Sequence, residues 1–136
     1  MTFADNYQCR KSLVAWLKAN ATILATLDDS LEIREKDWQA EDYTYPNIRV
    51  TCAVSTTQCT ITDGTAIISY YSEKKSSKQA IQSQGIIAKQ LHNTGFTSES
   101  IKISSIRNLI LPDAEQVLEG VWKADVQFSF QAVEVT

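Results

Sequence analysis

Three carboxylates cluster late in the chain, in the segment 113–120 with the sequence DAEQVLEG. Asp113, Glu115 and Glu119 are residue types that bind a divalent cation or exchange protons with a substrate, provided that they converge in a partly buried site. The segment has the composition of an acidic connector between two strands, where carboxylates are usually solvated. We therefore interpret these residues as surface charges. A metal-dependent enzyme that uses them is the alternative.

Nucleophilic catalysis needs an oriented base beside the nucleophile. His92 is the single histidine, and it falls at the predicted end of a helix, where its proton suits the helix dipole. The four glycines are scattered singly, so no glycine-rich phosphate loop is present. The sequence therefore predicts no catalytic residue, no cofactor site and no enzyme.

The three cysteines, Cys9, Cys52 and Cys59, have neither the spacing of a metal site nor a histidine nearby. We expect free thiols, buried, in a reducing compartment. A Cys52–Cys59 bridge across a hairpin stays open as an alternative.

A basic cluster, Lys74, Lys75 and Lys78, surrounds the predicted start of a helix. It is either a solvated loop or a contact for an acidic partner surface or passing DNA. No interleaved aromatic residue supports base stacking. The net charge of −3 and the pI near 5.1 argue against a protein whose main role is to grip nucleic acid.

The chain has 136 residues, 43% hydrophobic and 21% charged, which is typical of one soluble globular domain spanning 1–136. Neither a signal peptide nor an apolar run long enough to span a bilayer is evident, so we expect a cytoplasmic protein without membrane contact.

Helical periodicity predicts helices over 5–19, with Asp5 as N-cap, and over 21–27. A third helix is predicted over 77–92, opened by a capping box of Ser76 and Gln79.

Strands are predicted over 45–54, 65–72, 100–111 and 122–132, with a short edge strand at 31–35. The last strand alternates strictly between apolar and polar residues, so one face is buried and one is wet. A polar hairpin arm at 55–64 is expected to end in a turn at Asp63-Gly64. The prediction is an α+β fold: a mostly antiparallel sheet of four or slightly more strands, with the N-terminal and central helices packed on one face.

Large aromatic residues fall in a less regular stretch of the sequence. Trp38, Tyr43 and Tyr45 are there either to anchor a subunit interface or to form a small local core.

Four stretches together resemble a known family: TILATL after the first helix, YPNIRV opening a strand, IIAKQLHN ending the central helix, and GVWKADVQFSF in the last strand. Their order resembles that of the tail-terminator and tail-completion proteins of tailed phages, the gpU-like minor tail proteins. This resemblance implies a hexameric ring that caps the tail tube, stops its growth and joins the tail to the head.

The resemblance also implies the partners: copies of the chain, the tail tube protein and a neck or connector protein. DNA would pass through the channel without specific binding, at the tail-neck junction of a virion assembled in the host cytoplasm. The alternatives are another neck or head-tail joining protein of similar fold and a small non-enzymatic binding module. The candidate interface or channel residues are Thr57, Gln58, Thr60, Lys74, Lys75, Lys78, Asp113, Glu115, Gln116 and Glu119.

Overall fold

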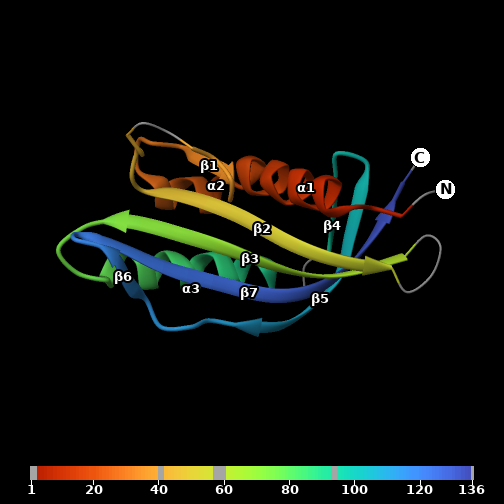
Figure 1. Cartoon of the computed structure of the whole chain (residues 1–136). Coiled ribbons are helices and arrows are strands. Elements are labelled where there is room, and N and C mark those ends of the chain that lie inside the picture. Colours follow the sequence, from red (N-terminus) through yellow and green to blue (C-terminus); the bar gives the residue numbers. More distant parts are fainter. Residues whose placement is uncertain (1–2, 40–41, 57–60, 93–94, 136) are drawn as a thin grey trace.

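The computed structural model describes residues 3–39, 42–56, 61–92 and 95–135, which form helices and one seven-stranded sheet (Figure 1). None of the helices in these residues has the length and apolar content that a membrane crossing requires. The helices are α1 (Asn6–Ala19), α2 (Ala21–Leu24) and α3 (Lys78–Leu91), with a 3-10 turn η1 (Ala25–Leu27) after α2. The strands are β1 (Glu32–Glu35), β2 (Asn47–Thr56), β3 (Ile61–Glu73), β4 (Phe96–Ser98), β5 (Ile101–Ile110), β6 (Glu115–Leu118) and β7 (Val121–Glu134).

Asp5 and Asn20 are the N-caps of the two N-terminal helices. The Asp5 carboxylate accepts a 2.8 Å hydrogen bond from the Gln8 backbone N–H, and the Gln8 side chain accepts one from the Asp5 N–H. Asn20 ends α1 and caps α2, because its side-chain oxygen accepts a hydrogen bond from the Ile23 N–H. The helices predicted at 5–19 and 21–27 are confirmed. One stripe of α1 is buried in the core: Cys9, Leu13 and Leu17.

The sheet has the strand order β1-β2-β3-β7-β5-β4, and β6 pairs with β7 beside β5. β1 runs parallel to β2, and the other pairs are antiparallel. β3 and β7 form the centre, paired without interruption from Ile61–Val133 to Glu73–Val121. The strand predicted over 65–72 therefore lies at the centre of the sheet, and the α+β class and the edge position of β1 are confirmed. The sheet is larger than four strands.

The helices cover one face of the sheet. α3 packs on β3 and β7, while α1 contacts β1 and β2 and also β4, so the sheet curls around α1 (Figure 1). From Ala124 to Ala132, burial along β7 alternates as predicted: Phe130 is fully buried, whereas Ser129 and Gln131 are half-buried on the opposite side, which we call the open face. At the start of the strand the pattern differs, because Val121 is buried and Trp122 is half-buried. The buried residues of β7 are Val121, Ala124, Val126, Phe128, Phe130 and Ala132.

The predicted turn at Asp63-Gly64 is wrong, because β3 runs straight through these residues and pairs them with Gln131 and Phe130. Glycine is needed at position 64 because the Phe130 ring packs directly against it. A Cβ atom placed there would lie 2.6 Å from Cζ of Phe130 and 3.0 Å from Cγ1 of Val54. The connection between β2 and β3 falls instead in 57–60, outside the described residues.

Gly64→Ala should lower the free energy of unfolding by about 1–3 kcal/mol, because the new methyl group forces the buried Phe130 ring to move. Gly85→Ala is the matched control: a methyl group added there meets nothing within 4 Å, and the residue sits inside α3. There the same change should raise stability by about 0.4–1 kcal/mol. Chemical denaturation measures both, and a Gly64→Ala protein as stable as the wild type contradicts the packing argument.

The predicted capping box at the start of α3 is also wrong. Ser77 occupies the N-cap position, and its side chain makes no capping hydrogen bond. The Gln79 side chain points elsewhere, since it accepts a 2.6 Å hydrogen bond from the Ser72 hydroxyl and donates one of 3.1 Å to Asp28. The Gln79 side chain therefore makes tertiary hydrogen bonds instead of the local bond that a capping box requires.

Candidate functional site

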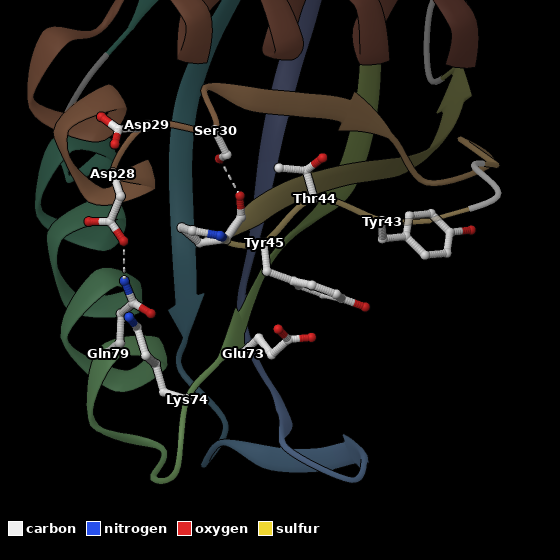
Figure 2. Close-up of a pocket in the computed structure, with 10 residues that line it drawn as sticks. Asp28, Asp29, Ser30, Tyr43, Thr44, Tyr45, Glu73, Lys74 and Gln79 are labelled. Carbon is white, nitrogen blue, oxygen red and sulfur yellow. Dashed lines mark hydrogen bonds between the residues drawn. The ribbon is translucent and has the colours of Figure 1, made fainter.

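The first candidate is a polar pocket of about 500 Å³ at one end of the sheet (Figure 2). It lies where three connections meet: the turn after η1, the segment 43–46 before β2, and the segment 73–79 that leads from β3 into α3. The pocket is lined by three carboxylates, Asp28, Asp29 and Glu73, and by one lysine, Lys74. The charged groups of its lining are therefore mostly acidic.

Hydrogen bonds engage two polar side chains of the pocket, Ser30 and Asp28. The Ser30 hydroxyl is shared between the carbonyl oxygens of Leu27 and Pro46. Asp28 accepts a hydrogen bond from the Gln79 amide (Figure 2). Burial raises the pKa of the Tyr45 hydroxyl, which keeps that group neutral. Neither histidine nor cysteine occurs among the described lining residues, and the Ser30 hydroxyl bonds to backbone carbonyls rather than to one of the carboxylates. The pocket therefore combines several carboxylates with a serine hydroxyl that is already hydrogen-bonded to backbone carbonyls.

The aromatic residues of 36–46 form a small local core on the open face. The Arg49 guanidinium lies 4.3 Å from the ring centroid of Tyr43 and 4.1 Å from that of Tyr71. Trp38 meets Tyr43 edge to face, with ring centroids 5.1 Å apart. These contacts fix the loop to the sheet, as the local-core interpretation of Trp38 and Tyr43 predicts.

The basic cluster lies at the same end of the sheet as the pocket. Lys74 and Lys75 are exposed in the loop before α3, and Lys78 is its exposed first residue. The pairing of Glu73 with Val121 places this loop next to the turn between β6 and β7. The structure thus brings the lysine loop and the end of the acidic segment to one end of the molecule.

The acidic segment is more ordered than a connector, which corrects the prediction for 113–120. Residues 115–118 form β6, which pairs with the start of β7 and places Glu115 opposite Lys123 and Gln116 opposite Trp122. The Lys123 ammonium lies 3.7 Å from the Glu115 carboxylate.

The carboxylates Asp113, Glu115 and Glu119 are all exposed. In the part of the chain that the structure describes, no three His, Cys, Asp or Glu side chains are grouped as metal ligands.

The acidic segment and the two residues before Pro112 expose apolar side chains that the sequence analysis did not identify as a surface. Ile110 is 55% exposed, Leu111 44%, Val117 38% and Leu118 64%. In the sequence, this surface is indicated only by two apolar pairs, in ILP at 110–112 and in VLE at 117–119, on either side of an acidic stretch. The proline of the first triplet follows the end of β5. Exposed apolar residues grouped on a strand edge are typical of interaction surfaces.

Three predicted site residues, Thr57, Gln58 and Thr60, lie outside the described residues. The strands on either side of them, β2 and β3, pair as far as Thr56 and Thr62.

Cys9 and Cys52 are free thiols, so Cys52 takes no part in the bridge considered for Cys52–Cys59. Cys9 is fully buried, and Cys52 is half-buried. Burial is the main cause that raises the pKa of Cys9 to about 12 and that of Cys52 to about 11, although Arg10 partly lowers the latter. Both thiols are therefore held in the unreactive, protonated form.

In a Cys59→Ser variant, Cys52 should react with iodoacetamide at pH 8 about 100-fold more slowly than a free thiol of pKa 9. The reason is that a pKa of about 11 lowers the thiolate fraction by two powers of ten. Mass spectrometry of timed samples measures the rate, and the same protein in denaturant should react at the ordinary rate. Native labelling as fast as denatured labelling contradicts the burial of this thiol.

Comparison with known proteins rests on structure alone, since no protein-family model and no curated protein sequence matches the chain. A chain of the solved structure "Virion of native gene transfer agent (GTA) particle" superimposes with a TM-score of 0.64 and 11% identity, over 94% of this chain and 95% of that chain. A second solved structure, whose name states no function, gives a TM-score of 0.57 and 9% identity, over 93% and 90% of the two chains. The chain therefore shares its fold, over nearly its full length, with a chain of a gene transfer agent virion.

Proposed function

We propose that this chain is a structural protein of a phage or phage-like virion. The observation that carries the proposal is the shared fold with a chain of a gene transfer agent virion, which covers almost all of both chains. The pocket is compatible with this view, because its Ser30 hydroxyl and Asp28 carboxylate are engaged in hydrogen bonds with other lining residues. The proposed role is therefore non-enzymatic.

Within that class, we propose a hexameric ring that caps the tail tube, ends its growth and joins the tail to the neck or connector protein. The resemblance of YPNIRV, IIAKQLHN and GVWKADVQFSF to tail-terminator proteins supports this choice. Exposed apolar residues on β5 and β6 are the surface that a subunit of a ring needs. DNA passes through the channel, and the net negative charge of the subunit disfavours its adhesion.

Tail assembly with and without this chain tests the proposal. Cells that express the tail genes without it should produce tubes of variable, excessive length, because nothing stops the addition of tube subunits. Restoring the chain should give one uniform length. Equal length distributions in both cases would rule out termination.

A second candidate is another neck or head-tail joining protein of the same fold, since the name of the structural neighbour gives no position in its particle. The same experiment separates the two roles. Tails of normal length that fail to attach to heads in the absence of this chain favour joining over termination.

A further inference from the structure

One surface of the molecule combines apolar and acidic side chains on a strand edge. We call residues 110–119 the acidic edge. Four of the eight large apolar side chains that are exposed in the described residues lie in it. β6 has a strand partner only on its β7 side, so its outer edge is available for pairing. Asp113 and Glu119 form no ion pair within the described chain.

A second surface combines apolar and basic side chains in a groove of about 350 Å³ between α1 and β1. We call it the basic groove. Tyr7, Lys11, Val14 and Lys18 line it from α1 at a spacing of i, i+4, i+7 and i+11, which places them on one helix face. Tyr7 is 57% exposed. Trp38 lines the groove from the other side.

The charge of the basic groove is not fully neutralised within the subunit. Its two carboxylates, Glu35 and Asp37, lie 3.7 and 3.9 Å from the Arg10 guanidinium. Lys11 lies 3.7 Å from Glu99, but both side chains are about half exposed, so that pair contributes little. Lys18 has no ion pair among the described residues. Lys11 and Lys18 are therefore available to an acidic surface.

The two surfaces lie on opposite borders of the molecule. β1 is the first strand of the sheet, while β6 and the distal end of β5 flank the far side of β7 (Figure 1). A subunit cannot bring its own acidic edge to its own basic groove. An edge-to-edge contact between two copies would oppose like charges, which is unfavourable. The complementary surface is thus the groove of a second copy.

We propose that the acidic edge of one copy docks in the basic groove of the next, so that identical copies join head to tail. In this interface, Leu118 and Val117 of one copy pack against Tyr7 and Val14 of the next. The carboxylates that flank β6, Asp113 and Glu119, face Lys11 and Lys18. A head-to-tail contact repeated around an axis closes a ring. The inference rests on the proposed ring and assigns the contact that builds it, placing the acidic edge between subunits rather than in the channel.

Charge exchange tests the contact without touching the core. The first variant is Asp113→Lys with Glu119→Lys, and the second is Lys11→Glu with Lys18→Glu; all four positions are exposed. Each variant alone opposes like charges and should need at least about tenfold more protein to assemble than the wild type. Lys89→Glu, on the exposed side of α3, is the matched control and should assemble normally.

Mixing the two variants gives the decisive result. Every edge of one variant then meets a groove of the other with opposite charge, so rings of alternating composition should form. Native mass spectrometry identifies them by equal numbers of the two variants. Circular dichroism melting curves check that all the variants fold.

Each of the remaining outcomes contradicts a different part of the proposal. If the wild type assembles and both variants assemble equally well, the contact is wrong and the ring stands. If each variant fails alone and the mixture fails too, or gives only dimers, the pairing of edge with groove is wrong. If the wild type stays monomeric up to millimolar concentration, the proposed ring itself is overturned.

Discussion

Phe130→Ala should lower the free energy of unfolding by about 3–5 kcal/mol. Phe130 is fully buried in the middle of β7, with its ring against the backbone of Gly64 and 6.0 Å, centroid to centroid, from the ring of Phe128. Because Gly64 has no side chain, nothing from that position of β3 can fill the space that the ring leaves. The cavity therefore persists, and its cost adds to the lost burial of the ring.

The neighbouring Ser129→Ala change is the control, because Ser129 lies on the open face of the same strand. It should change stability by less than about 0.5 kcal/mol. Urea denaturation of the two variants gives both values from the midpoints. A loss below about 1 kcal/mol for Phe130→Ala would mean that the two central strands are not packed as described.

Gln84→Leu should cost about 2–5 kcal/mol, since it removes the buried amide that donates to two part-buried carbonyl groups. The Gln84 amide donates 2.7 Å hydrogen bonds to the carbonyl oxygens of Pro112 and Asp125. Asp125 lies between the β7 residues that pair with β6 and those that pair with β5, at a gap in the strand pairing. The Gln84 side chain of α3 therefore donates to a β7 carbonyl where no β5 or β6 residue is paired with it.

Gln82→Leu on the same helix is the matched control, because Gln82 is exposed. Thermal unfolding compares their stability, and hydrogen exchange reports the local effect. Gln84→Leu should speed exchange in residues 111–118, while Gln82→Leu should not. Equal stability of the two variants would show that the Gln84 amide does not hold the acidic edge in place.

The sequence was sufficient to predict those elements whose local pattern agrees with the tertiary structure. The alternation of β7 reflects one buried face, which period-2 spacing reports directly. Asp5 and Asn20 cap their helices with their own side chains, so these boundaries follow from residue type. The α+β class follows from the order of such elements.

The errors have physical causes outside the local pattern. Asp63-Gly64 has the composition of a turn, but the glycine is there for the Phe130 ring on another strand. Gln79 fits a capping box, but Ser72 and Asp28 are its partners. β6 has four residues, all exposed, so it has no alternation to detect.

The candidate site was predicted only in part. The charges of Asp113, Glu115 and Glu119 were recognised, but the exposure of Ile110 and Leu118 beside them was not, because exposure depends on where the sheet ends. The basic groove is formed by α1 and β1, which are separated in the sequence and join only in the folded chain. Neither surface has a local motif.

Electron microscopy of the purified wild-type protein, with its mass measured by light scattering, tests the central claim most directly. The account predicts closed rings of six copies of the 15.2 kDa chain, about 91 kDa in total. A single species of 15.2 kDa without rings, both alone and in the presence of tail tubes, would contradict it.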